Sequence, residues 1–331
     1  MPFVSPFAAS TSKPGHGHIT LAILPPDQPV LRSLASQYPL KLVAPDPLPP
    51  PGPSAHPARL VHTVFLLTYG GGIVAGDALE LAVRLHGNTR LILLTQGSTK
   101  IFKTPSPDLV SRQRMTVHLE HDSALVYLPD PVQPFAQTAF AQSQIYTLPQ
   151  EHGNLCVCDW VTSGRSARGE NWDVYEYKSR NEVWTVDEAG TKRLLLRDNL
   201  VLDELGQTEM QLASRMDGYS VFATVIVRGP LFAPLSTFFL HEFEALPRIG
   251  GRDWGDGGSP ELSAREQWRL ERQQREQADG LVWSAANVRG FVLVKLASRE
   301  VEGSRNWLRD MFTEEGSVLR LFGERAILCL K

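Results

Sequence analysis

Alternation of apolar and polar residues with a period of two is the dominant pattern along the chain. Leu79, Leu81 and Val83 alternate with charged or small residues, and Met115 and Val117 alternate with arginine, threonine and histidine. A period of two puts successive side chains on opposite faces, which is typical of a half-buried β-strand. The same kind of signal predicts further strands at residues 90–95, 124–128, 144–148, 155–161, 173–178, 182–186, 193–202, 219–228, 235–240, 291–297 and 326–330.

A clear helical face is confined to one late segment. Val301, Leu308 and Phe312 recur at helical spacing and predict a helix over residues 301–312. Residues 264–278 (AREQWRLERQQREQA) are good helix formers with almost no apolar stripe, so a second helix is predicted there, either exposed or docking a partner. We therefore predict an all-β dominated fold with about two helices near the C-terminal end.

Two stretches are too rich in proline or glycine to belong to a core. Residues 45–57 read PDPLPPPGPSAHP, and residues 249–260 read IGGRDWGDGGSP just before the second predicted helix. Proline-rich segments are extended and solvated, whereas glycine-rich ones favour loops. We interpret 45–57 as a surface loop and 249–280 as an insertion made of a loop and an exposed helix, within a single domain over residues 1–331.

A weak internal repeat organises the centre of the chain. Three units, at residues 81–103, 115–137 and 143–170, each read strand, polar turn, strand and polar trailing segment. Stacked β-hairpins of this kind would share one core and form a superhelical domain. Their trailing segments would then leave along the same edge, so residues 96–100, 130–133 and 164–170 are expected to lie close together.

Composition and charge narrow the class of protein. The 331 residues are 42% hydrophobic, and 33 basic minus 36 acidic residues gives a net charge of −3. A near-neutral chain lacks the excess of cations that nucleic-acid binding needs. No stretch resembles a membrane span or a secretory signal, and three cysteines do not make a disulfide framework. These features predict a cytoplasmic protein without a nucleic-acid or membrane partner.

Motifs for catalysis or nucleotide binding are weak. Residues 69–77 (YGGGIVAGD) are rich in glycine, but a strand pattern follows where a phosphate site needs the start of a helix. We interpret these glycines as a tight turn that Asp77 fixes. The sequence contains no GxSxG, HExxH or CxxC motif, so no catalytic residue is assigned.

Several residues are candidates for binding a metal ion. Cys156 and Cys158 lie at i, i+2, so both thiols point to the same face of a predicted strand. They are interpreted either as ligands for a soft cation or as small buried hydrophobic residues. His16 and His18 would bind Ni²⁺ or Cu²⁺ only weakly from a flexible tail, and chance is the better explanation for them. The carboxylates of the trailing edge, Asp130, Asp159 and Glu170, form the next group and suit a divalent ion in transit. Glu170 is equally well explained by a structural ion-pair cluster with Arg165 and Arg168.

Four ordered motifs resemble one known family. They are residues 66–77 (LLTYGGGIVAGD), 94–102 (LTQGSTKIF), 128–135 (LPDPVQPF) and 159–172 (DWVTSGRSARGENW). Together they resemble the UreD family of urease accessory proteins, called UreH in some bacteria. The end of the chain, residues 321–331, resembles the fungal and plant-type branch. The resemblance runs from about residue 15 to the C-terminus, whereas 45–57 and 249–280 depart from the shorter bacterial pattern.

The resemblance implies a role without catalysis. Members of this family are single β-rich superhelical domains with few helices. They scaffold apo-urease together with a UreF-type accessory protein, through which a UreG-type GTPase joins. Nickel is thought to pass through an interior channel toward the urease active site, so Ni²⁺ would be cargo in transit and no cofactor would be permanently bound.

A nickel route suggests roles for particular residues. Weak, exchangeable ligands lower the barrier for an ion without trapping it. Because they lie in or beside the matching motifs, Asp77, Asp130 and Glu170 are expected to line or guard the route, with Cys156 and Cys158 as less favoured stations. Two other functions remain open. One is a purely structural adaptor for urease assembly, and the other is an enzyme on a β-solenoid, which would need a cleft with paired carboxylates.

Overall fold

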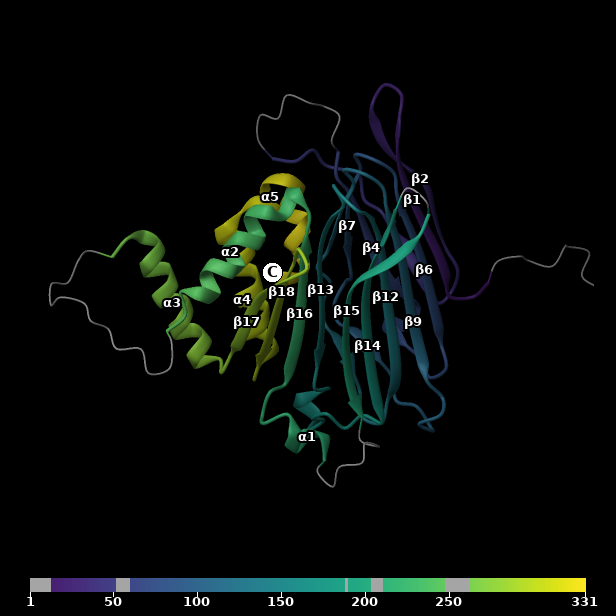
Figure 1. Cartoon of the computed structure of the whole chain (residues 1–331). Coiled ribbons are helices and arrows are strands. Elements are labelled where there is room, and N and C mark those ends of the chain that lie inside the picture. Colours follow the sequence, from purple (N-terminus) through teal and green to yellow (C-terminus); the bar gives the residue numbers. More distant parts are fainter. Residues whose placement is uncertain (1–12, 52–59, 188–189, 204–210, 248–261) are drawn as a thin grey trace, which may run out of the picture.

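Two β-sheets packed face to face form the body of the molecule, and helices cover the outer face of one of them (Figure 1). The computed structural model describes residues 13–51, 60–187, 190–203, 211–247 and 262–331. Within this part, three layers follow one another: helices, an eleven-stranded sheet and a seven-stranded sheet.

The sheets are mixed in strand direction, with parallel pairing at their centres. In the described residues, the seven-stranded sheet has the order β15 (Lys192–Asp203), β14 (Glu176–Val186), β12 (Ala139–Pro149), β9 (Ser111–Leu119), β6 (Ala78–Leu85), β1 (His16–Leu24) and β2 (Gln28–Ser36). The main path of the other sheet is β17 (Val282–Val288), β18 (Phe291–Ser298), β16 (Val221–Arg228), β13 (Asn154–Thr162), β10 (Ala124–Tyr127), β7 (Arg90–Leu94), β4 (His62–Thr68) and β3 (Leu40–Val43). Three short strands lie off this path: β5 (Gly72–Ile73), β8 (Thr99–Ile101) and β11 (Val132–Pro134).

Burial explains why the two sheets have different sequence patterns. Buried and exposed residues alternate along β6, because one face of the seven-stranded sheet meets solvent. Every residue of β7 and of β10 is buried, because those strands lie between the other sheet and the helices. The all-β dominated prediction is thereby confirmed for the described residues.

The internal repeat is real, but its unit is a β-arch rather than a hairpin. β6 and β7 follow each other in sequence yet belong to opposite sheets. The first strands of the units pair in parallel, as β6 with β9 and β9 with β12, and so do the second strands β7, β10 and β13. The predicted hairpin was wrong because a strand that is apolar on both faces is buried best in the middle layer.

The trailing segments do lie close together, as the repeat predicts. Val132 pairs with Thr99 of the first trailing segment and with Val161 at the end of β13. The Gln133 Nε2 atom donates a hydrogen bond to the Gly164 carbonyl oxygen at 3.2 Å. Residues far apart in the sequence therefore meet along one edge of the arches.

The helices are more numerous than the sequence suggests. The described residues contain α1 (Leu212–Arg215), α2 (Ala233–Glu244), α3 (Ala264–Ala278), α4 (Val301–Glu315) and α5 (Ser317–Phe322), as well as the 3₁₀-helix η4 (Glu324–Leu330). The strand predicted at 235–240 is wrong, because Leu235, Phe238 and Phe239 bury one face of α2. The strand predicted at 326–330 is also wrong. Its short apolar run has no period that separates a strand from a helix.

The predicted helix over 264–278 is present as α3, but it is not exposed all round. Glu242 of α2 is completely buried and accepts hydrogen bonds from three arginines of α3. Arg272 is 2% exposed and also pairs with Glu276, which in turn accepts hydrogen bonds from two tryptophans. The cluster comprises Glu242, Arg265, Arg269, Arg272, Glu276, Trp283 and Trp307. The face that packs is charged, which is why the sequence lacks an apolar stripe.

Parts of the predicted loops lie outside the described residues. This applies to residues 52–57 of the first loop and to all of 249–260. Within the described part, Leu48 forms a β-bridge with Val61. The extent of a single domain over residues 1–331 stays a prediction.

Gly229, between β16 and the helices, is expected not to tolerate a side chain. Its φ is +102°, and a Cβ there would lie 2.4 Å from the Gly153 carbonyl oxygen. We expect Gly229→Ala to lower the free energy of unfolding by about 2–4 kcal/mol, measured by urea denaturation. Gly218→Ala is the control, because Gly218 has a φ of +77° with no atom near its Cβ position. Equal losses for the two variants would contradict the argument from close packing.

Candidate functional site

A polar region around Asp159 interrupts the apolar packing between the two sheets. Asp159 projects from β13 toward the seven-stranded sheet, on the same strand face as the apolar Leu155 and Val157. Its carboxylate accepts hydrogen bonds from Gln142 Nε2 and Asn181 Nδ2, both at 2.7 Å, and from the Ser179 hydroxyl. Strands β12 and β14 position these donors, so one carboxylate links the two sheets.

The position of Asp159 between the sheets raises the pKa of its carboxyl group. Burial is the largest cause, and the hydrogen bonds from Ser179, Asn181 and Gln142 act in the opposite direction. The nearby charge of Asp198 raises the pKa further. Asp159 nevertheless keeps some accessible surface. A carboxyl group with a raised pKa that lies deep in the molecule yet remains accessible is a candidate functional group.

A cavity of about 420 Å³ opens beside this carboxylate, and we call it the Asp159 cavity. Its polar lining includes Asp159, Tyr177, Asp198, Thr224 and Lys295. The Lys295 ammonium donates hydrogen bonds to Asp198 Oδ1 at 2.6 Å and to Thr224 Oγ1 at 3.1 Å. The cavity therefore exposes two carboxylates, one of which is already neutralised by a lysine.

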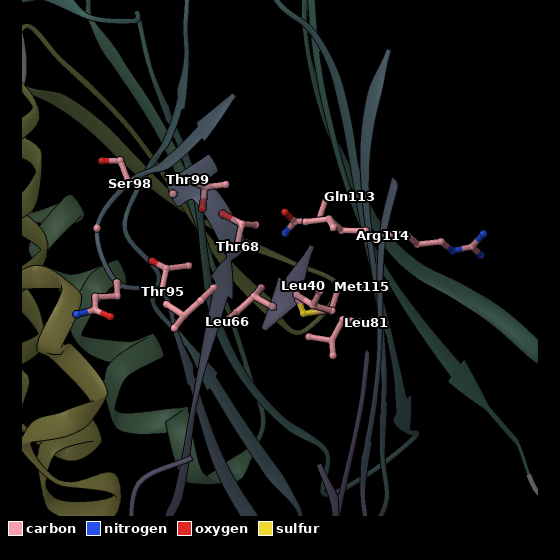
Figure 2. A pocket seen from close by; sticks show the side chains of 15 residues that line it. Leu40, Leu66, Thr68, Leu81, Thr95, Ser98, Thr99, Gln113, Arg114 and Met115 are labelled. Atoms are coloured by element: carbon pink, nitrogen blue, oxygen red, sulfur yellow. The ribbon is translucent and has the colours of Figure 1, made fainter. Parts of the chain in front are cut away.

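A second cavity of about 250 Å³ lies at the edge where the trailing segments meet, and we call it the threonine cavity. Figure 2 shows Thr68, Thr95 and Thr99 on one side of it and Gln113 opposite, above a floor of leucines and Met115. The predicted trailing segment 96–100 supplies much of this lining. Uncharged oxygens and amides in such a cavity suit water or a hydrated ion rather than a tightly held one.

Asp130 contacts residues that line the threonine cavity without lining it itself. It is 8% exposed, and its Oδ2 accepts hydrogen bonds from Thr95 Oγ1 at 3.2 Å and from the Gly97 backbone amide at 2.9 Å. Its other oxygen pairs with Arg305 Nη1 at 3.0 Å. Asp130 thus fixes the loop that lines the cavity and does not itself line either cavity.

Glu170 and Asp77 are held by their own surroundings. Glu170 forms an ion pair with Arg165, and the guanidinium of Arg165 lies 3.9 Å from the centre of the Phe135 ring. The hydrogen bond from Arg165 is the largest cause of the lowered pKa of the Glu170 carboxyl group. Asp77 Oδ2 accepts a hydrogen bond from the Val74 backbone amide at 3.0 Å, so it fixes the glycine-rich turn as expected.

The cysteine and histidine candidates have structural explanations. Cys156 and Cys158 share one face of β13, as predicted, and are buried in the core between that strand and the helices. Burial raises the pKa of both thiols, so they are protonated at neutral pH and poor metal ligands. His16 and His18 lie within β1 rather than in a flexible tail, so that expectation was wrong.

The five predicted site residues are not brought together around one point. Among the residues that the structure describes, no group of three or more His, Cys, Asp or Glu side chains is arranged to hold a metal ion. Asp159 was one of three trailing-edge carboxylates in the sequence, and only the structure distinguishes it. The available signal was a single carboxylate in an otherwise buried strand (LCVCDWV). No helix in the described ranges has the length and apolar character needed to cross a bilayer.

Comparison with known proteins agrees with the resemblance in the four motifs. Residues 15–324 match the family model described as UreD urease accessory protein. Urease accessory protein 4 of Cryptococcus neoformans var. grubii is 32% identical over 326 residues, with 89% of each chain covered. Urease accessory protein D of Arabidopsis thaliana is 34% identical over 197 residues, which cover 60% of this chain and 62% of the plant protein. The chain therefore belongs to the UreD family of urease accessory proteins.

Proposed function

We propose that this protein is a non-catalytic factor in urease maturation. The observation that carries the proposal is the family match over residues 15–324, together with relatives named urease accessory proteins in a fungus and a plant. In this role it would act in the cytoplasm and hold apo-urease together with a UreF-type accessory protein. A UreG-type GTPase would join through the latter.

We further propose that Ni²⁺ passes between the two sheets as cargo. The inner faces supply hydroxyl, amide and carboxylate oxygens around the Asp159 cavity and hydroxyl and amide groups around the threonine cavity. The buried Asn181 Oδ1 has no protein partner and is free to accept a hydrogen bond from water or from the hydration shell of an ion. An ionised Asp159 would attract a divalent cation into this low-dielectric interior.

Ligands in such a passage need to hold nickel weakly. Asp159 already accepts three hydrogen bonds from protein groups, and these compete with a cation for its lone pairs. Asp198 is likewise paired with Lys295. Because protein groups already engage each carboxylate, a nickel ion is expected to bind there only briefly. Brief binding is what delivery of the ion to another protein requires.

A purely structural adaptor remains the alternative function. It would hold the same partners while nickel travels elsewhere, and the ion pairs of Asp130 and Glu170 are compatible with it because they stabilise loops. The two functions differ in whether nickel loading depends on polar groups inside the molecule after the complex has assembled.

Reconstitution with apo-urease and the other accessory proteins tests the maturation role. Omitting this protein is expected to abolish both complex assembly and nickel loading, measured by co-elution and by nickel bound per urease active site. Normal loading without it would contradict the proposal.

The predicted guard residues are tested in the same assay. We expect Asp130→Ala combined with Glu170→Ala to reduce nickel loading about tenfold, which corresponds to about 1.4 kcal/mol on a barrier. The control is Asp173→Ala combined with Glu302→Ala, which removes two exposed carboxylates. Unchanged nickel content in the first double variant would remove Asp130 and Glu170 from the route.

A further inference from the structure

The outer face of the seven-stranded sheet carries a groove with basic sides, which we call the cationic groove. Two neighbours of the strand β12 supply its sides, and β12 itself supplies small residues as its floor. The groove is defined by Arg112 and Arg114 of β9, Ala141 and Ser143 of β12, and Lys178 and Arg180 of β14. It has a volume of about 400 Å³.

Strand register places the cations opposite one another across the groove. Ala141 is level with Arg112 on one side and with Lys178 on the other. Ser143 is level with Arg114 and Arg180 in the same way. Since neighbouring strands lie about 4.8 Å apart, the two basic strands are about 10 Å apart, with little side-chain bulk between them.

The cations of the groove have spare hydrogen-bonding capacity. Among the described residues, no carboxylate lies within 4.0 Å of the Arg112 or Arg114 guanidinium, and the Arg112 side chain donates only to the Val110 carbonyl oxygen. Figure 2 shows Arg114 extending away from the interior, whereas the neighbouring Gln113 points into it. An unsatisfied guanidinium presents a planar set of donors that matches a carboxylate.

The β14 side of the groove is only partly neutralised. Lys178 forms an ion pair with Glu176. Arg180 lies 4.0 Å from Glu182, but that carboxylate already accepts a hydrogen bond from Arg197 at 2.9 Å. On the other side, Glu80 of β6 is level with Arg114, and its carboxylate lies 3.6 Å from His16. The four cations of the groove therefore exceed the carboxylates that flank them on these strands, which are Glu80, Glu176 and Glu182.

This concentration of positive charge is local. The chain as a whole has a net charge of −3, so bulk composition does not explain it. The helices α2 and α4 pack on the other sheet, and in the described ranges no helix covers the groove (Figure 1). An excess of cations on an uncovered sheet face is a feature of electrostatically complementary interfaces.

We propose that the cationic groove binds an extended acidic segment of a partner protein in the urease maturation assembly, an inference that rests on the proposed function. In an extended chain, every second side chain lies on the same side with a repeat of about 6.7 Å. Arg112 and Arg114, and likewise Lys178 and Arg180, are spaced by this same repeat. Carboxylates at alternate positions would therefore meet a cation at each step, and the small floor would let the segment approach closely.

The first experiment uses the isolated full chain and a probe of defined chemistry. A fluorescein-labelled peptide of four Glu-Ser repeats is titrated at low ionic strength and followed by fluorescence anisotropy, with a Gln-Ser peptide as the neutral probe. We expect Arg114→Gln combined with Arg180→Gln to weaken binding about tenfold. The matched control is Arg84→Gln on the same sheet face but outside the groove, with a change of less than about twofold expected.

Several results would overturn the proposal. One is equal affinity of the wild type and the double variant for the acidic peptide. Another is a loss of peptide affinity in Arg84→Gln as large as that in the double variant, which would show that binding depends on the net charge of the protein and not on the groove. Tighter binding of a single-stranded oligonucleotide or of phosphatidylserine vesicles than of the peptide would replace the acidic segment with another class of partner. Urea denaturation of each variant separates these outcomes from misfolding.

The second experiment separates the groove from the proposed function. In the reconstitution, the double variant is expected to lose co-elution with its partner, and Arg84→Gln to retain it. If the wild type supports nickel loading and the double variant assembles and loads equally well, the groove proposal fails alone. If the wild type itself has no effect on urease, the maturation role fails, whereas peptide binding still reports on the groove.

Discussion

Glu242→Ala is expected to lower the free energy of unfolding by about 3–5 kcal/mol, because it leaves buried positive charge without its partner. Glu242 is completely buried and joins α2 to Arg265, Arg269 and Arg272 of α3. Arg272 is 2% exposed, so water cannot replace the lost carboxylate. The measurement is urea denaturation followed by circular dichroism.

A carboxylate on the outer side of α3 provides the matched control for Glu242. The exposed carboxylate of Glu271 accepts a hydrogen bond from Gln267 Nε2 of the same helix at 2.8 Å. Glu271→Ala is therefore expected to change stability by less than about 0.5 kcal/mol. If Glu242→Ala and Glu271→Ala have the same effect, the buried ion cluster does not hold α3 in place.

Asp159→Asn is expected to reduce nickel loading of urease at least about tenfold while the complex still assembles. At a separation of about 4 Å and an effective dielectric constant of about 20, two unit charges interact by about 4 kcal/mol, so removing the carboxylate charge removes a large attraction for a cation. Asp173→Asn removes a charge from the surface and is the control. Normal loading by Asp159→Asn would favour the structural adaptor.

The pH dependence of stability provides a second test of Asp159. Its pKa in the folded protein is raised above the unfolded value, so the folded state binds more protons between the two values. The contribution of Asp159 to stability therefore falls as the pH rises from about 4, the unfolded value. Relative to the wild type, Asp159→Asn is expected to gain stability with increasing pH over this window, and a constant difference would contradict the raised pKa.

The sequence predicts most strands because burial on one face leaves an alternating pattern. Strand β6 shows it clearly, and so does β9. The sequence does not reveal in which sheet the next strand, β7, lies. Strand β7 is apolar on both faces, and a turn of the same length can connect two strands as a hairpin or as an arch. The helix α2 was missed because its first residues include proline, serine and threonine, which weaken the helical signal.

The candidate site is less predictable than the fold. The repeat correctly places residues 96–100 beside 130–133, and thus identifies the edge at which the threonine cavity lies. The surroundings of Asp159 include hydrogen-bond donors from β12 and β14. These strands come close to Asp159 through the packing of the two sheets, which no local sequence pattern predicts. For the same reason, the sequence cannot separate a carboxylate that lines a cavity from one held by an arginine, such as Asp130.

The stacked arches also bear on how the chain folds. Each arch adds one strand to each sheet and pairs with the arch before it. Once the first arches have formed, each further arch can therefore be added by closing a single loop of modest length. The pairing of β1 with β6 instead joins residues near 16 to residues near 80. Contacts of long sequence separation form at a higher entropic cost, so the arches are expected to fold first and β1 to dock onto them late.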